Sequence, residues 1–363
     1  MYAYSHGGNV AFERGAEELL DLSANINPLG IPAGVREAIV EAIPNCDRYP
    51  DSFSGALREQ IGLFEGVNPG WIFCGNGASD VIFRIPRAVG AKRVLLTAPT
   101  FSDYERSARS FGAEVIHHTL LAEREFTLDG GFVQAIQKRK PDLVFVCNPN
   151  NPTGKLVKPE LMQDILHACK EVGAWLVVDE CFLDFAEQAE AYTSRHMLAT
   201  YENLIILKAF TKLFTLPGIR LGYALSSNQG LIEQLYFHGA DWPISNLAQA
   251  AGIAALQGAE GFIKQTVALV TKARKRVEGE LEGLGFRVFE GAANYVFFQH
   301  PHPFDLREAL DRKGIRIRAC GNYPGLDESY YRIAVSTEAH NQIAHKALTE
   351  LMSSYTKKGD VLS

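Results

Sequence analysis

Four segments of the sequence each place a reactive or anion-binding group directly after a predicted strand. Asp179 follows the apolar run Leu176–Val178, and Lys212 lies a few residues beyond the next apolar run. An amide-bearing turn, Asn148–Gly154, and a small-residue turn, Gly75–Asp80, follow two further runs. Because ligands bind at the carboxyl ends of the strands in open α/β sheets, we expect these groups to meet at one edge of a sheet.

An amide, a carboxylate and an amine in this order are the parts that a pyridoxal phosphate site requires. The Lys212 amine could form an imine with the cofactor aldehyde, provided that it lies near the ring and can lose its proton. The Asp179 carboxylate could keep the pyridine nitrogen protonated, because a nearby opposite charge favours the charged form. A side-chain amide could bind the phenolic oxygen, and N–H groups at a helix N-terminus suit the phosphate.

The elements that must position these groups alternate between strand and helix from about residue 31 to residue 260. Short apolar runs predict strands at Arg93–Ala98, Glu114–Thr119, Asp142–Cys147, Ala174–Val178, Asn203–Lys208 and Arg220–Leu225. Between them, stretches such as Lys158–Val172 carry apolar residues at three- and four-residue spacing, which is typical of helices. We therefore predict an α/β fold with a mainly parallel sheet and helices on both faces.

The pattern changes on either side of this region. Residues 1–30 read as an irregular N-terminal arm, 31–260 as a large cofactor-binding domain, and 261–363 as a smaller α+β C-terminal domain. The smaller domain is predicted to hold helices at 262–284, Phe304–Lys313 and Glu338–Ser353 and strands at Phe286–Phe289, Tyr295–Gln299, Ile315–Arg318 and Tyr331–Val335.

Composition excludes several classes of protein. The 363 residues include 42 Asp and Glu against 36 Lys and Arg, and a net charge of −6 disfavours binding to nucleic acid or an anionic membrane. The first residues show no secretory signal and no run is long enough to span a membrane, so we expect a cytoplasmic protein. Six scattered cysteines predict buried free thiols, without a disulfide or a metal site.

The segment Lys212–Tyr223, with the sequence K-L-F-T-L-P-G-I-R-L-G-Y, resembles the lysine segment of fold-type I pyridoxal phosphate enzymes. With the upstream N-N-P-T-G and D-E motifs in order, the chain resembles the histidinol-phosphate aminotransferase branch, class I/II, over nearly its whole length. The resemblance implies that Lys212 is the Schiff-base lysine. It also implies that Asp179 partners the pyridine nitrogen and that Asn151 contacts the phenolic oxygen.

The same resemblance assigns the remaining cofactor contacts. Gly77, Ala78 and Ser79 are expected to cradle the phosphate, with help from Thr211 and Arg220. Phe101 is at the position of the aromatic ring that stacks on the cofactor. Tyr49 is expected to reach the phosphate from a partner subunit, which implies a homodimer.

Three segments point to one subgroup of the branch. His6–Asn9 (H-G-G-N), Ser23–Gly30 (S-A-N-I-N-P-L-G) and Asn322–Asp327 (N-Y-P-G-L-D) resemble the O-phosphothreonine decarboxylases of cobalamin biosynthesis. Such an enzyme forms 1-aminopropan-2-ol phosphate from a small phosphorylated amino acid. A histidinol-phosphate aminotransferase uses the same parts and is the alternative. A pyridoxal-phosphate-binding regulator would carry a DNA-binding domain ahead of the fold, where we find only the arm.

Two positions depart from the aminotransferase pattern. Phe182 stands where these enzymes typically place a Tyr, which agrees with the decarboxylase-like segments. Ala209 occupies a position where a hydroxyl residue is common, so one phosphate contact is missing.

A phosphate and a carboxylate on one substrate require more than one cation or helix terminus. Arg332 matches the substrate-anion arginine of the family, and Arg318 is at a second anion position. Arg316 shares a strand face with Arg318 by the two-residue period, so either could contribute. His6 and Asn25, in the arm, are expected to close over the substrate.

Overall fold

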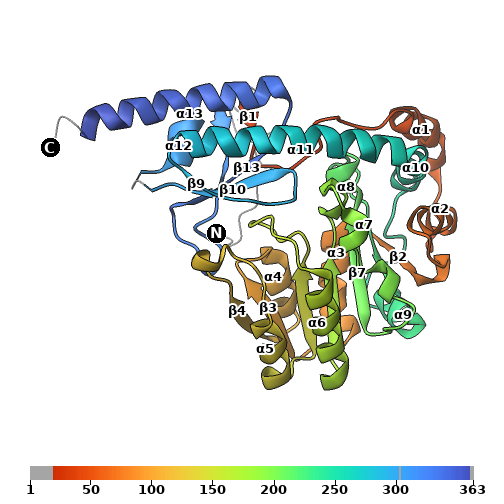
Figure 1. The fold of residues 1–363 in the computed structure, drawn as a ribbon. Coiled ribbons are helices and arrows are strands. Elements are labelled where there is room, and N and C mark those ends of the chain that lie inside the picture. The colour runs from red at the N-terminus through yellow and green to blue at the C-terminus, as the bar shows by residue number, and fades with distance from the viewer. Residues whose placement is uncertain (1–18, 302–303, 360–363) are drawn as a thin grey trace.

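The computed structural model describes residues 19–301 and 304–359, and a seven-stranded sheet forms its centre (Figure 1). The strand order is β2-β8-β7-β6-β5-β3-β4. The strands are β2 (Ile72–Gly75), β3 (Arg93–Ala98), β4 (Glu114–Thr119), β5 (Leu143–Cys147), β6 (Trp175–Asp179), β7 (Leu204–Ala209) and β8 (Gly222–Leu225). Among these seven strands β8 runs opposite to the other six, so the predicted mainly parallel sheet is confirmed.

Helices cover both faces of this sheet, as predicted. Neighbouring residues of β6 separate into two apolar clusters: Leu176 and Val178 pack on one face, and Val177 packs on the other. The first face is covered by α1 (Val35–Ala42), α2 (Gly55–Glu65), α5 (Gly131–Arg139), α6 (Pro159–Val172) and α10 (Asn246–Leu256). The second is covered by α3 (Ala78–Ala88), α4 (Ser102–Ser110) and α9 (Gln229–Phe237). Strands buried on both faces explain the continuous apolar runs.

A second, antiparallel sheet with order β12-β13-β10-β9 lies in the C-terminal part of the chain. Its strands are β9 (Arg287–Phe289), β10 (Tyr295–Gln299), β12 (Arg318–Ala319) and β13 (Tyr330–Ala334). The helices of this part are α11 (Ala259–Gly283), α12 (Leu306–Asp311) and α13 (Glu338–Gly359), and α11 and α13 run side by side in Figure 1. The smaller sheet and these helices agree with the α+β arrangement predicted for this part of the chain.

The chain changes sheets inside the predicted strand Ile315–Arg318. Its first half, β11 (Ile315–Arg316), pairs in parallel with β1 (Leu20–Asp21), which comes from the predicted arm. Its second half, β12, pairs with β13 instead. Residues 20–21 therefore pair with the C-terminal part of the chain, in a separate two-stranded sheet. The domain boundary at residue 260 remains a prediction, because α11 packs Val270 against the large core and Val277 against the small one.

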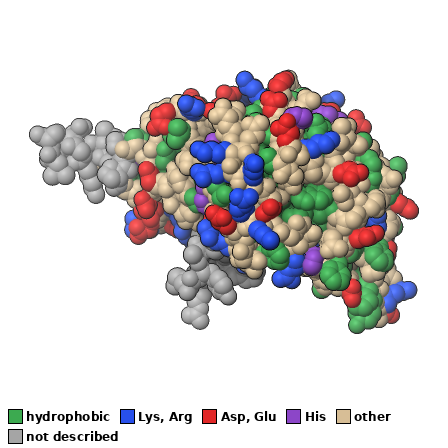
Figure 2. Space-filling view, turned by 90° about the horizontal axis from the view of Figure 1, so that it is seen from below, with side chains coloured by type: hydrophobic (Ala, Val, Ile, Leu, Met, Phe, Trp, Pro, Cys, Tyr) green, Lys and Arg blue, Asp and Glu red, His purple; other side chains and the backbone are tan. Residues whose placement is uncertain are grey.

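Figure 2 shows the end of the large domain that faces away from the small sheet, where Lys and Arg side chains gather near the middle. The helices that lead into the parallel strands end here, and their last turns carry Arg87, Arg109, Lys138, Arg139 and Lys170. Cations at helix C-termini complement the helix dipole. Within the described ranges, no helix combines the length and apolar character needed to cross a membrane.

Candidate active site

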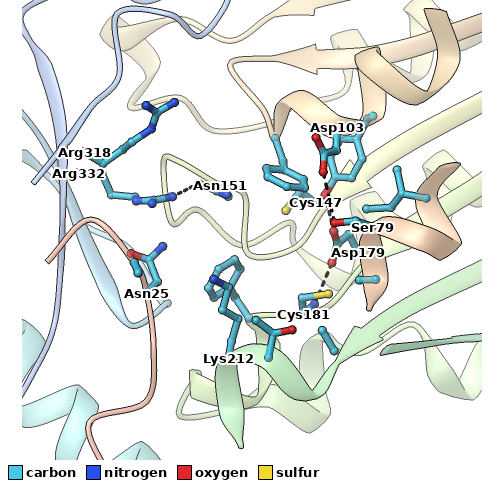
Figure 3. Close-up of a pocket in the computed structure, with 18 of the residues that line it drawn as sticks. Asn25, Ser79, Asp103, Cys147, Asn151, Asp179, Cys181, Lys212, Arg318 and Arg332 are labelled. Atoms are coloured by element: carbon cyan, nitrogen blue, oxygen red, sulfur yellow. Dashed lines mark hydrogen bonds between the residues drawn. The ribbon is translucent and has the colours of Figure 1, made fainter. Parts of the chain in front are cut away.

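A cavity of about 280 Å³ opens at the carboxyl ends of the parallel strands, between the two sheets. Eleven of the predicted site residues line it: Asn25, Ala78, Ser79, Phe101, Asn151, Asp179, Thr211, Lys212, Arg220, Arg318 and Arg332. Figure 3 shows Lys212 directed into the cavity, with Asn25, Arg318 and Arg332 on one side and Asp179 and Ser79 on the other. His6 lies outside the described residues. Long-range folding therefore brings the predicted groups together.

Asp179 ends β6 and is 6% exposed. Its Oδ2 accepts a hydrogen bond of 2.5 Å from the Tyr104 hydroxyl, and its Oδ1 accepts one of 3.0 Å from the Cys181 N–H. Burial, with the nearby Asp179 charge, raises the pKa of Tyr104 well above its usual value, so the phenol stays a donor. The carboxylate is thus held in one orientation at the cavity wall.

Sequence reasoning missed Tyr104, although a local signal was present. Tyr104 follows Phe101 by three residues, and the two lie at the start of α4 with ring centroids 5.6 Å apart. Residues three apart lie on the same side of a helix. The predicted stacking role of Phe101 therefore indicates that Tyr104 also faces the cofactor site. Cys147 and Cys181, which flank Asp179, and Tyr323 also line the cavity and were not predicted.

Lys212 lies in α8 (Phe210–Leu213), a single helical turn that follows β7. Burial first, and then the positive charge of Arg332, lower the pKa of Lys212 to about 8. Its Nζ lies 5.9 Å from the centre of the Phe182 ring. An amine with this pKa is in part neutral at physiological pH, as a nucleophilic amine must be.

The turn before α3 forms a narrow cradle. Gly77, at the N-cap, has φ 81° and no side chain that could cap the helix, which leaves the first N–H groups of α3 facing the cavity at Ala78 and Ser79. A Cβ on Gly77 would lie 2.6 Å from the Arg220 guanidinium, and one on Gly222 would lie 2.4 Å from the Ala78 nitrogen. The close approach of β8 therefore requires glycine here, and it puts Arg220 beside the helix N-terminus.

Arg332 is 5% exposed and bridges two parts of the cavity wall. Its Nη1 donates to Asn151 Oδ1, and its Nη2 donates to the Ser23 carbonyl at 2.9 Å. With its side-chain oxygen turned toward Arg332, Asn25 accepts from Nε at 3.3 Å and from Nη1 at 3.2 Å. The guanidinium also lies over the Tyr295 ring, 5.1 Å from its centre.

Arg318 lies directly opposite Arg332 in the pair β12–β13. It is 9% exposed, donates to Asn322 Oδ1 at 2.8 Å and lies over the Tyr323 ring. Arg316, in β11, is not among the residues that line the cavity. Its Nε is instead paired with Asp311 Oδ1 at 2.5 Å. The sheet change at Ile317 thus separates two arginines that the strand period had placed on one face.

Tyr49 lies away from the cavity of its own chain. It is 78% exposed and stacks on Trp242 with ring centroids 4.4 Å apart. Its expected contact with the phosphate of a partner subunit stays a prediction.

The residues fit pyridoxal 5′-phosphate on structural grounds. The cavity combines an amine of lowered pKa, a carboxylate held by two donors, and a helix N-terminus beside Arg220. These are the groups needed by an aldehyde, a pyridine nitrogen and a phosphate. Fold and site together are those of a fold-type I pyridoxal phosphate enzyme.

Comparisons with known proteins place the chain in a family. The family described as aminotransferase class I and II matches residues 17–348, so the chain belongs to it. Pyridoxal 5′-phosphate is accordingly the cofactor.

Relatives with two different activities are equally similar to the chain. A threonine-phosphate decarboxylase of Salmonella typhimurium is 31% identical over 362 residues, covering 97% of this chain and 98% of the relative. A histidinol-phosphate aminotransferase of Desulfitobacterium hafniense is also 31% identical, over 337 residues and 91% of each chain. The crystal structure of a histidinol-phosphate aminotransferase from Clostridium acetobutylicum has a TM-score of 0.87 at 31% identity, covering 93% of this chain and 100% of its own.

Proposed function

We propose that this protein decarboxylates L-threonine O-3-phosphate to 1-aminopropan-2-ol O-phosphate in cobalamin biosynthesis. The observation that carries the proposal is the pair of buried arginines, Arg318 and Arg332, opposite each other at one wall of the cavity. The substrate brings a phosphate and a carboxylate, and a cation for each anion is the simplest complement. The resemblance of Ser23–Gly30 and Asn322–Asp327 to the decarboxylases supports the choice of substrate.

When bound, the cofactor supplies an aldehyde for the substrate amine and a ring that accepts the electron pair of a bond broken at Cα. Asp179, held by Tyr104 and the Cys181 N–H, provides the negative charge for the pyridine nitrogen. Lys212 can take up or deliver a proton at Cα, because its lowered pKa of about 8 lets both protonation states occur near neutral pH.

The arginines would decide which bond to Cα breaks. By holding both anionic groups, Arg318 and Arg332 orient the substrate about its Cα relative to Lys212. In decarboxylation the bond to the carboxylate breaks, carbon dioxide leaves and a proton takes its place at Cα. Phe182, which lines the cavity, offers no hydroxyl at the position where aminotransferases of this branch typically have a Tyr.

The second candidate is a histidinol-phosphate aminotransferase, because relatives with that name share the same 31% identity. It would use the same cavity, with Lys212 moving the proton of the Cα–H bond instead. The two activities differ in the orientation of the substrate and in the need for a keto acid.

The deciding experiment incubates the holoenzyme with carboxyl-labelled L-threonine O-3-phosphate and, separately, with histidinol phosphate and 2-oxoglutarate. Release of labelled carbon dioxide with formation of the phosphorylated amino alcohol is expected in the first reaction. Amino transfer from histidinol phosphate without carbon dioxide release would replace the proposal with the second candidate. Arg318→Met should raise the KM, whereas the matched variant Arg316→Met, outside the cavity, should leave it nearly unchanged.

We also propose that the protein is a homodimer. Seven of the ten large apolar side chains recorded as exposed in the described ranges lie on or between α1, α2, α9 and α10: Val40, Ile43, Tyr49, Phe53, Leu63, Phe237 and Trp242. Such exposed apolar groups are typical of surfaces that bind another protein. Sedimentation of the holoenzyme should give twice the chain mass, and Tyr49→Ala should weaken cofactor binding. A monomer with full activity would contradict this proposal.

A further inference from the structure

Asn27 lies between β1 and α1 and joins three separate parts of the chain. It is 2% exposed, and its Nδ2 donates to the Leu213 carbonyl and to Thr266 Oγ1, each at 2.8 Å. Its backbone N–H donates to the Lys212 carbonyl at 3.2 Å. One buried residue thus holds the last two carbonyls of α8 and connects them to α11.

The short helix α8 needs such support. A single turn of helix is not stable by itself, and its last carbonyls have no partner inside the helix. Two residues after its end, Thr215 has a φ of 55°, which is unfavourable for a β-branched residue. The Thr215 hydroxyl donates to the Asn27 carbonyl at 3.2 Å. Asn27 therefore donates hydrogen bonds to the last carbonyls of α8 and accepts one from Thr215, whose backbone is strained.

The segment that contains Asn27 also reaches the opposite wall of the cavity. Its Ser23 carbonyl accepts from Arg332, and its Asn25 side chain faces the same guanidinium. Residues 23–27 therefore form a strap that runs from Arg332, on one side of the cavity, to the helix that carries Lys212. Figure 3 shows the strap residue Asn25 below Arg332 and to the left of Lys212.

We propose that Asn27 is a positioning residue, which holds α8 so that the Lys212 amine is aimed into the cavity and kept out of water. The inference rests on the proposed role of Lys212. Loss of the Asn27 amide frees the end of α8, which lets the amine leave its buried position. Misplacement of a reacting group by about 1 Å can lower a rate by ~100-fold.

The experiment compares Asn27→Ala and Asn27→Asp holoenzymes with the unaltered protein. The substrate is L-threonine O-3-phosphate, or histidinol phosphate should that be the one turned over. We expect kcat to fall by roughly 10- to 100-fold, with the KM for substrate changed less than threefold. The pH midpoint for uptake of pyridoxal 5′-phosphate by the apoprotein should rise, because an amine released toward water regains its ordinary pKa.

Asn203→Ala is the matched control. The Asn203 amide also donates to a carbonyl, that of Ala174 at 2.9 Å, but it precedes β7 at the opposite end from Lys212. This variant should keep both kcat and the uptake midpoint. Thr266→Val, which keeps the shape of the buried Thr266 and replaces the hydroxyl that accepts from Asn27 by a methyl group, should move both readouts in the direction of Asn27→Ala by a smaller amount. It also tests the inference should Asn27→Ala fail to fold.

The inference is overturned if the Asn27 and Thr266 variants keep the kcat and the uptake midpoint of the unaltered protein and lose only thermal stability. Failure of the proposed decarboxylation would appear as amino transfer from histidinol phosphate without carbon dioxide release and would leave the Asn27 comparison intact. Failure of the proposed role of Lys212 would look different. In that case Lys212→Ala would still bind the cofactor with its usual visible absorbance, whatever the Asn27 variants do.

Discussion

Two lysines, the buried Lys208 and the half-buried Lys212, stand four residues apart in the sequence and occupy opposite electrostatic surroundings. Lys208, on β7, has its Nζ 3.1 Å from Asp184 Oδ1, 3.9 Å from Glu180 Oε2 and 4.0 Å from Glu65 Oε1. These carboxylates outweigh burial and raise the pKa of Lys208 above its usual value. Lys212 faces Arg332 and Arg220, and its pKa is lowered to about 8.

The difference shows that neighbours from distant segments decide what a buried amine does. The carboxylates around Lys208 come from α2 and from the segment after β6, and two of them also accept hydrogen bonds from other groups. The Tyr223 hydroxyl and Arg195 donate to Glu65, and Thr193 and the Ser194 N–H donate to Glu180. Lys208 is therefore a permanently charged structural group. Among the residues that the structure describes, Lys212 forms no ion pair with a carboxylate, so its amine is available for chemistry.

The largest expected effect separates the two lysines by activity. Lys212→Ala should lower turnover by roughly 10²–10⁴-fold or more, because it removes the amine that moves protons at the substrate. It should also abolish the visible absorbance of the bound cofactor. Lys208→Met should keep that absorbance in its folded fraction. If the two variants lost absorbance equally, the division of roles between the lysines would be wrong.

The second effect separates the lysines by stability. Lys208→Met leaves three carboxylates without their shared cation, which should lower the free energy of unfolding by about 3–5 kcal/mol. Urea denaturation measures this change. The control Lys138→Met, at the exposed C-terminal turn of α5, should change stability by less than ~0.5 kcal/mol. A Lys208→Met protein as stable as the unaltered one would show that the cluster does not stabilise the fold.

A third, smaller effect comes from Glu180 in the same cluster. Burial raises the pKa of Glu180 from 4.5 to about 7 despite the attraction of Lys208. Between these pH values the folded state holds a proton that the unfolded state has released, so stability falls as the pH rises through this window. The loss is on the order of 1–3 kcal/mol.

Glu180→Gln should remove this pH dependence, which urea denaturation at several pH values between 4.5 and 7 would show. Glu202→Gln, at an exposed position, should retain it. An unchanged slope in Glu180→Gln would assign the proton to another group.

The smallest effect concerns the surroundings of Lys212. Arg332→Met removes a positive charge that disfavours the ammonium form, so the pKa of Lys212 should rise by up to roughly one unit. The pH midpoint for uptake of pyridoxal 5′-phosphate by the apoprotein reports this change. Arg316→Met, whose guanidinium pairs with Asp311 outside the cavity, should leave the midpoint in place. A midpoint that did not move in Arg332→Met would show that the charge of Arg332 does not lower the pKa of Lys212.

Much of the secondary structure of this protein follows from local sequence patterns. The run Trp175–Asp179 is entirely apolar up to its final carboxylate, so both the strand and the position of Asp179 at its end were predictable. In α6, Pro159 begins the helix and Gly173, with a φ of 74°, ends it, which explains why the predicted range Lys158–Val172 agrees closely. Lys212 was predicted in the same way, from its place after β7.

Other features depend on contacts between distant segments. The two-residue period could not separate Arg316 from Arg318, because the chain leaves one sheet for another between them. The hydrogen bonds of Asn27 to α8 and of Tyr104 to Asp179 join residues 186 and 75 positions apart. Hydrogen bonds between side chains so far apart along the chain produce no periodic pattern in the sequence.

The order of strands and helices, the cofactor chemistry and the residue types at the strand ends are predictable from the amino-acid sequence, since they follow from hydrophobic periodicity and short motifs. Folding in three dimensions establishes which lysine is paired and which is available, which arginine faces the cavity, and what holds the lysine-bearing turn. These features need the fold because charge, burial and hydrogen bonding act through space between groups that are far apart along the chain.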